Sequence, residues 1–200
     1  MKLLYATSNP AKYTAMRDAL QPLGIRLLSL RDMNQVPVAP EEGKTLQENA
    51  RQKALFYYQH YEIPLFSCDS GLYFENLPQE LQPGIHVRSP QGVYLDDQAM
   101  LDYYGGLAAR YGDLTARYRN AVCLITDPKH IYESMDESLA SNRFLLTARP
   151  HRILRPGFPL DSLSKKLPSG EYYYDINSHD ADDLVGYEGF TAFFRENLLS

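Results

Sequence analysis

Apolar and polar stretches alternate along the first part of the chain with the periods of strands and helices. Short apolar runs at residues 2–7 and 25–30 predict two strands. Between them, residues 11–20 carry apolar side chains at helical spacing, Pro10 suits a first helical position, and Gly24 ends the segment. The chain therefore begins with a predicted strand–helix–strand unit.

The alternation continues and strands then gather toward the second half. Helices are predicted over residues 45–61, 96–111 and 190–199, and strands over residues 64–68, 115–126, 130–135 and 143–148. The last two strands are expected to pair with each other as a hairpin. This order predicts an α/β fold with a mixed β-sheet flanked by helices, in a single domain spanning residues 1–200.

A carboxylate and a hydroxyl directly follow the predicted buried strand at residues 64–68. Asp69 and Ser70 come next, and Gly71 predicts an abrupt turn after them. Ligands of α/β proteins gather at such strand ends, so this position is a candidate site. An ordinary turn after a strand is the alternative.

A second polar group, Thr-Ser-Asn-Pro-Ala-Lys at residues 7–12, separates the first predicted strand from the first helix. Backbone N–H groups at a helix start attract phosphate, and Lys12 would add a full positive charge. Asn9 and Ser8 would supply further donors. Simple helix capping explains the same residues without any ligand.

A third polar group begins the helix predicted at residues 45–61. Thr45 and Glu48 match a capping box, which is a purely structural interpretation. Alternatively, Glu48 turns outward and binds Mg²⁺ together with Asp69, while Lys53 meets phosphate. Magnesium prefers few carboxylates plus water and phosphate oxygens, so two convergent acids would suit it.

Bulk composition narrows the function classes. The chain has 200 residues, a formal net charge of −5 and scattered Lys and Arg, which argues against a nucleic-acid-binding surface. No apolar run could span a bilayer and the N-terminal run is too short for a signal peptide, so a cytoplasmic protein without membrane contact is expected. Cys68 and Cys123 lie in apolar runs and are expected to be buried free thiols.

The three polar groups, in this order, resemble signatures of the inosine triphosphate pyrophosphatase family. The similar segments are residues 7–12 (Thr-Gly/Ser-Asn-x-x-Lys in the family), 45–54 (Thr-x-x-Glu-Asn-Ala-x-x-Lys-Ala), 68–72 (Asp-Asp-Ser-Gly-Leu), 83–88 (Pro-Gly-Ile followed by Arg) and 116–123 (Ala-x-Phe/Tyr before an apolar strand end). The resemblance covers about residues 2–126.

The resemblance implies an enzyme that hydrolyses noncognate purine nucleoside triphosphates to the monophosphate and pyrophosphate with Mg²⁺. It also implies an elongated mixed sheet with two lobes and a central cleft, and a homodimer. Asp69 would be the general base and a metal ligand, and Glu48 the other metal ligand. Contacts to the triphosphate or sugar would come from Thr7, Ser8, Asn9, Lys12, Lys53, Ser70 and Arg88.

The second half resembles the family less closely. Cys68 stands where the family has the first aspartate of its Asp-Asp-Ser-Gly motif. Residues 157–161 are similar to the Gly-Phe-Gly-Tyr-Asp segment that stacks on the base, but Leu160 replaces the tyrosine. The resemblance therefore still implies substrate contacts for Phe158 and Asp161.

The family's Lys…Ser-His-Arg pattern, which reads the purine carbonyl, is also only partly kept. His179 matches the histidine and is an expected substrate contact, whereas Asp180 replaces the arginine and Tyr174 stands about where the lysine belongs. A donor exchanged for an acceptor should weaken the preference for an oxo group and could favour an amino-bearing base. The alternatives are thus an enzyme with altered base specificity, or a degenerate relative that binds nucleotide or a partner without catalysis.

Overall fold

The computed structural model describes residues 1–176 and 187–199. Its strands are β1 (Lys2–Tyr5), β2 (Arg26–Ser29), β3 (Leu65–Phe74), β4 (Leu114–Asp127), β5 (His130–Ser134), β6 (Phe144–Leu146) and β7 (Ser164–Lys166). Its α-helices are α1 (Pro10–Leu20), α2 (Leu46–Tyr61), α3 (Asp97–Tyr111) and α5 (Tyr187–Leu198). Among these described residues, every helix is too short or too polar to cross a membrane.

The strands form one mixed sheet, as the sequence predicted. The strand order is β2-β1-β3-β4-β6-β7, and β5 pairs with β4 beside this path. β1 is parallel to both β2 and β3, whereas β4 is antiparallel to β5 and to β6, and β6 is antiparallel to β7. The early α/β alternation therefore builds the parallel part, and the later strands add the antiparallel part.

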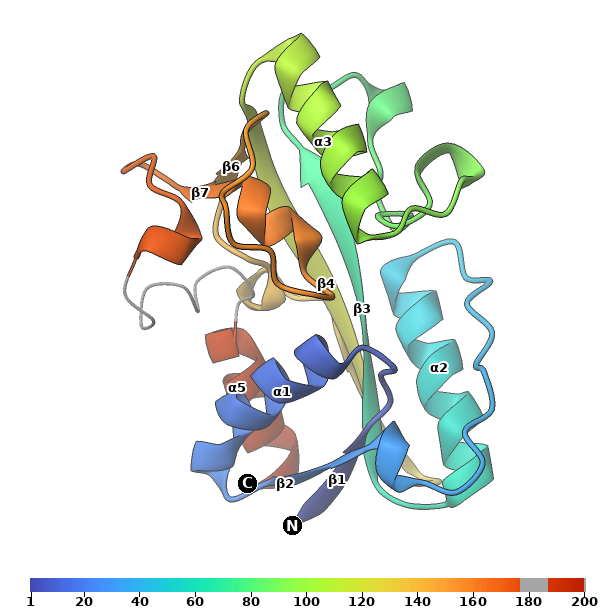
Figure 1. Cartoon of the computed structure of the whole chain (residues 1–200). Coiled ribbons are helices and arrows are strands. Elements are labelled where there is room, and N and C mark those ends of the chain that lie inside the picture. Colours follow the sequence, from blue (N-terminus) through green and yellow to red (C-terminus); the bar gives the residue numbers. More distant parts are fainter. Residues whose placement is uncertain (177–186, 200) are drawn as a thin grey trace. The chain divides into compact units, whose positions relative to one another are not determined.

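The described chain forms two compact units. The first unit comprises Met1–Ser70, Asn120–Leu139 and residues 187–199. Its core packs α1 and α5, which run beside each other in Figure 1, against strand residues such as Leu3, Tyr5 and Phe66. Alternate side chains of these strands point to the opposite face, where α2 packs and where the buried Ser67 hydroxyl donates a hydrogen bond to the Ala50 carbonyl.

The second unit comprises residues 71–119 and 140–176 of the described chain. Its separate core gathers α3 with the second half of β3, the first half of β4, β6 and the segment after it. The largest fully buried side chains there are Tyr104 and Phe144. Figure 1 shows α3 (yellow-green) running along this part of the sheet. Each unit thus has its own apolar core.

The predicted helices are present with boundaries close to those expected. Asn9 caps α1, Thr45 caps α2 and Asp96 caps α3 through side-chain oxygens that accept backbone N–H bonds. Gly112 follows the last residue of α3 with a positive φ of 84°, a conformation in which glycine is favoured. Local capping chemistry therefore determined where these helices start and end.

The strand before the candidate site is longer than predicted. β3 continues through Gly71 to Phe74, so the abrupt turn expected at Gly71 is wrong. The physical reason for a glycine is close approach: a Cβ at Gly71 would lie 2.8 Å from the Gly84 carbonyl oxygen. Leu72 and Gly84 exchange two backbone hydrogen bonds beside it, at 2.9 and 3.1 Å.

The predicted hairpin is also wrong. β5 and β6 do not pair with each other, because the fourteen residues of β4 offer each of them a separate stretch of edge. β5 pairs with residues 122–127 of β4 and β6 with residues 114–116. β7, which lies beside β6 in the sheet, was not predicted, because its three residues carry no strand-like apolar alternation.

Candidate functional site

The loop from β1 to α1 is organised by helix capping. Asn9 Oδ1 accepts hydrogen bonds from the backbone N–H groups of Ala11 at 2.9 Å and Lys12 at 3.3 Å. The Asn9 N–H in turn donates to Thr7 Oγ1 at 3.2 Å, and Ser8 is exposed. The capping interpretation is therefore confirmed for the Asn9 side chain. Capping and anion binding are compatible, because the start of α1 keeps its partial positive charge.

The start of α2 is likewise capped. Thr45 Oγ1 accepts from the Glu48 N–H at 3.1 Å, and Glu48 Oε2 accepts from the Lys44 N–H at 2.6 Å. The Glu48 side chain thus folds back onto the loop before the helix, as a capping residue does. Its role as a metal ligand stays a prediction.

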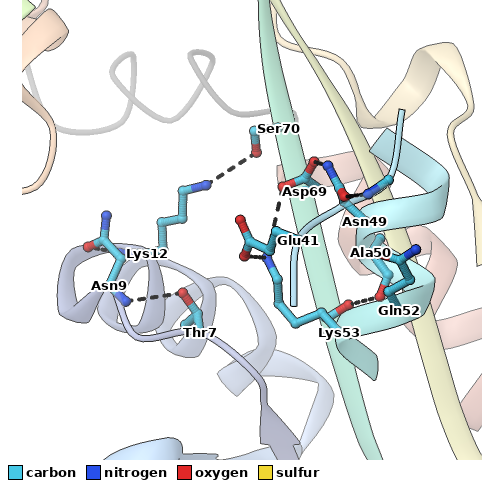
Figure 2. Close-up of polar contacts among 12 residues, drawn as sticks. Thr7, Asn9, Lys12, Glu41, Asn49, Ala50, Gln52, Lys53, Asp69 and Ser70 are labelled. Carbon is cyan, nitrogen blue, oxygen red and sulfur yellow. Dashed lines mark hydrogen bonds and ion pairs between the residues drawn. The ribbon is translucent and has the colours of Figure 1, made fainter. Parts of the chain in front are cut away.

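One face of α2 meets the Asp69 carboxylate on β3 (Figure 2). Asn49 Nδ2 donates to Asp69 Oδ2 at 3.2 Å, and Lys53 Nζ lies 3.9 Å from Asp69 Oδ1. Asn49 and Lys53 are four residues apart, so one helical face presents both of them to the strand. The Gly43 N–H donates to Asn49 Oδ1 at 2.8 Å, which leaves the amide nitrogen of Asn49 to serve Asp69.

A second lysine reaches the same region from α1. Lys12 Nζ donates to Ser70 Oγ at 3.4 Å, and Ser70 directly follows Asp69 on β3. Figure 2 shows Lys12 and Lys53 extending from different helices toward the same stretch of β3. Burial and the charge of Lys53 lower the pKa of Lys12 below its ordinary value. The first unit therefore brings together four of the predicted site residues, Lys12, Lys53, Asp69 and Ser70.

The Asp69 carboxylate is largely buried, with 15% of its side chain exposed. Burial raises the pKa of Asp69, while the charge of Lys53, the Asn49 hydrogen bond and the charge of Lys12 oppose that rise. Burial and the neighbouring groups change the pKa of Asp69 in opposite directions, and burial has the larger effect. The result is a carboxylate that binds a proton more readily than an ordinary aspartate.

Two residues at this site were not assigned a role from the sequence. Glu41, in the loop before α2, lies 2.6 Å from Lys53 Nζ through its Oε1 atom. Asn49 orients Asp69 as described above. Asn49 lies within the segment that resembles the family motif, so that motif was the available signal. Glu41 lies in a loop rich in proline and acid, where only the fold could reveal its contact with Lys53.

The other predicted substrate residues that the structure describes lie in the second unit. Arg88 pairs with Asp97 at 2.7 Å. The Arg155 guanidinium lies over the Phe158 ring, 5.0 Å from its centroid. Burial raises the pKa of Asp161 to about 6, and the charge of Arg155 opposes this only in part. His179 lies outside the described residues.

The departures from the family pattern have clear structural correlates. Cys68 is a buried free thiol, as predicted, and burial raises its pKa to about 12. Cys123 is buried and free as well. Leu160 is buried in the core of the second unit. The Tyr174 hydroxyl is buried, while Asp180 lies outside the described residues.

Known proteins resemble this chain in sequence. The model of the Ham1 family matches residues 3–139, and the chain belongs to this family. The dITP/XTP pyrophosphatase of Christiangramia forsetii is 34% identical over 124 residues, which cover 62% of this chain and 64% of that relative. The dITP/XTP pyrophosphatase of Porphyromonas gingivalis is 31% identical over 138 residues, 68% of this chain and 70% of the relative. The family resemblance drawn from the sequence is thereby confirmed.

Solved structures agree on the fold. A HAM1 protein from Coxiella burnetii matches with a TM-score of 0.75 at 17% identity, covering 98% of this chain and 99% of that one. The Ham1 protein of Staphylococcus aureus matches with a TM-score of 0.73 at 14% identity. In sequence, however, the matched segments span only 64% and 62% of the length of the Christiangramia forsetii and Exiguobacterium relatives.

Proposed function

We propose that the protein hydrolyses a noncognate purine nucleoside triphosphate to the monophosphate and pyrophosphate. The observation that carries the proposal is the convergence of Lys12, Lys53, Asp69 and Ser70 in the first unit of a Ham1 family member. The relatives named dITP/XTP pyrophosphatases support the same substrate class. The family resemblance further suggests a homodimer, and the charge and apolar runs of the sequence separately suggest a cytoplasmic protein without nucleic-acid or membrane contact.

The triphosphate would be bound by positive charge from two helices. Lys12 and Lys53 supply full charges, and the start of α1 near Asn9 supplies partial charge. Ser70 offers a hydroxyl beside Lys12, and Thr7 and Ser8 line the same loop. Phosphoryl transfer depends mainly on placement and charge neutralisation, which this set of residues is suited to provide.

Asp69 would take the proton from the attacking water. Its raised pKa makes it a better proton acceptor than an ordinary aspartate would be. Asn49 donates a hydrogen bond to Oδ2 of Asp69, and the Gly43 N–H donates one to Asn49. The carboxylate is therefore oriented before substrate arrives. Lys53 lies beside the other oxygen, Oδ1, and would stabilise the ionised form.

The donor set fits Mg²⁺. Among the described residues there is no group of three or more His, Cys, Asp or Glu side chains that could hold a metal. Magnesium needs only one or two carboxylates and completes its shell with water and phosphate. Asp69 and Glu41, which both border Lys53, would hold it, with Glu48 as the other sequence-predicted ligand. When bound, the ion would neutralise charge on the phosphates.

Pyrophosphate release with Mg²⁺ across a panel of nucleoside triphosphates tests the proposal. Asp69→Asn should abolish release while the fold, measured by circular dichroism, is kept. Asp127→Asn is the matched control, because this half-exposed aspartate lies at the far end of β4, where its side chain pairs with His130. Wild-type protein that releases no pyrophosphate from any nucleotide would instead support the binding-only alternative.

Altered base specificity is the second candidate. The buried hydroxyl of Tyr174 and the buried Leu160 favour it, since both stand where the family has different side chains. The same nucleotide panel decides the question. Selective hydrolysis of inosine or xanthosine triphosphate would refute altered specificity, whereas turnover of an amino-bearing base would support it.

A further inference from the structure

One carboxylate in the second unit connects two loops that carry predicted substrate residues. Asp97 is the first residue of α3. Its Oδ1 accepts a hydrogen bond from Arg88 Nη2 at 2.7 Å, and its Oδ2 accepts one from the Gly157 N–H at 3.0 Å. Gly157 immediately precedes Phe158. Both oxygens of Asp97 are therefore engaged with loops rather than with its own helix.

Helix capping does not account for this arrangement. The start of α3 is capped by the neighbouring residue Asp96, whose Oδ1 accepts from the Ala99 N–H at 2.8 Å. The Asp97 side chain is 31% exposed and the Arg88 side chain 33% exposed, so the pair is neither deeply buried nor freely hydrated. A surface pair of this kind contributes little to stability, roughly 0–1 kcal/mol. A role in placing Arg88 and Gly157 explains the geometry better than a role in folding.

Arg88 is restrained but keeps donors available. Its Nη1 donates to the Leu95 carbonyl at 3.4 Å, and its own carbonyl accepts from the Leu95 N–H at 2.7 Å. A guanidinium has five N–H donors, and Asp97 and Leu95 take two of them. Within the described chain the other three have no partner. Arg88 is thus held in one orientation with part of its fork available to a ligand.

The loop on the other side of Asp97 is shaped to present an aromatic ring. Gly157 has a φ of 86°, which favours glycine, and the Phe158 N–H donates to the Arg155 carbonyl at 3.0 Å. Arg155 also lies over the Phe158 ring. The bond from Gly157 to Asp97 fixes the start of this turn, and hence the direction in which Phe158 leaves it.

We propose that Asp97 is a positioning residue for the nucleotide, which holds the Arg88 guanidinium and the Gly157–Phe158 turn in fixed relation to each other. The proposal rests on the proposed function, in which Arg88 and Phe158 contact the substrate. Asp97 itself touches neither phosphate nor base. It lowers the cost of binding by ordering both contacts before the nucleotide arrives.

The pairing requires an ionised carboxylate with two acceptor oxygens. Burial alone would raise the pKa of Asp97, but the Gly157 N–H and Arg88 outweigh it and hold this pKa below the ordinary value. An asparagine has only one oxygen and keeps at most one of the two bonds. An alanine keeps neither. The two substitutions therefore give a graded test.

The first experiment measures kinetics of pyrophosphate release for Asp97→Asn and Asp97→Ala. We expect KM to rise about tenfold or more in Asp97→Ala and less in Asp97→Asn, with kcat changed by less than about threefold. When Arg88 is already replaced by Ala, the Asp97→Ala substitution should raise KM by a smaller factor than it does in the wild type, because the two residues act together. Equal effects on KM and kcat, or fully additive effects, would overturn the proposal.

Two control variants separate positioning from generic weakening of α3. Asp102→Asn removes a charge from the same helix at a side chain that contacts Gln98 and not Arg88. Asp96→Ala removes the helix cap. Neither should reproduce the rise in KM, although Asp96→Ala should lower the melting temperature. If Asp96→Ala raises KM as much as Asp97→Ala does, Asp97 acts only through the stability of the helix.

The second experiment does not depend on activity. Hydrogen–deuterium exchange of the backbone around Gly157 should accelerate several-fold in Asp97→Ala, while a distant amide in α3 should keep its wild-type rate. Unchanged exchange at Gly157 would overturn the proposed link. If wild-type protein hydrolyses no nucleotide, the proposed function fails first, and the exchange result alone decides whether Asp97 orders the turn.

Discussion

The second unit holds a carboxylate that is expected to lower the stability of the protein at neutral pH. Asp161 lies in a short 3₁₀ segment, Pro159–Leu163, whose neighbouring side chains are buried. Burial raises its pKa from 3.8 to about 6. Because Asp161 binds its proton more tightly in the folded state than in the unfolded state, the free energy of unfolding falls as pH rises from about 4 to about 6.

The size of this effect can be worked out from the shift. The pKa of Asp161 rises by about two, and each pKa unit is worth about 1.36 kcal/mol, so the rise corresponds to roughly 3 kcal/mol. Partial solvent contact of the side chain reduces this to about 2 kcal/mol. Asp161→Asn has no charge to bury, so it should be about 2 kcal/mol more stable than wild type at pH 7 and nearly equal to it below pH 4.

Urea unfolding, monitored by circular dichroism and tyrosine fluorescence, measures this difference between pH 4 and pH 8. Asp113→Asn removes the same charge from an exposed position of the same unit and controls for net charge. A stability difference between Asp161→Asn and wild type that does not change with pH would refute the reasoning. Because Asp161 is also a predicted substrate residue, the stabilised variant should lose nucleotide turnover.

Three further changes test packing and site geometry. Gly189→Ala should destabilise the protein by about 2–3 kcal/mol in urea unfolding, because its Cβ would lie 1.9 Å from the Ser138 carbonyl oxygen. Gly106→Ala, in open space on α3, should instead stabilise by about 0.5–1 kcal/mol in the same assay, and a loss there would contradict the helix geometry. Asn49→Ala should lower kcat for pyrophosphate release by about 10- to 100-fold, since a hydrogen bond to the charged Asp69 is worth about 1.5–3 kcal/mol. An unchanged kcat would show that Asn49 does not orient that carboxylate.

Sequence reasoning succeeded where neighbouring residues carry the information. Asn9 and Thr45 each cap a helix, as their sequence context predicted, and the bond from side chain to backbone spans only two or three residues. Asp69 and Lys53 were likewise assigned from motifs within short segments. The structure places these two residues beside each other.

Sequence reasoning failed where residues far apart in the sequence determine the local structure. Gly71 looked like a turn, yet its role depends on Gly84, thirteen residues later, which pairs with β3. The expected partner of β6 was wrong for the same reason: β6 pairs with the start of β4, far back in the sequence, and not with the neighbouring β5. Glu41 shows the same limit at the site, since its loop has no periodic pattern and only the fold brings it to Lys53.

The spacing of Asn49 and Lys53 on α2 limits how this sequence can change in length. Each residue added to an α-helix rotates the remainder of the helix by about 100° relative to the part before it. One insertion between these two residues would turn either the amide or the ammonium away from Asp69, although the helix itself would still form. Insertions and deletions should therefore be tolerated in the loop at residues 36–40 but lethal to function between residues 49 and 53, a boundary that a library of single-residue insertions would reveal.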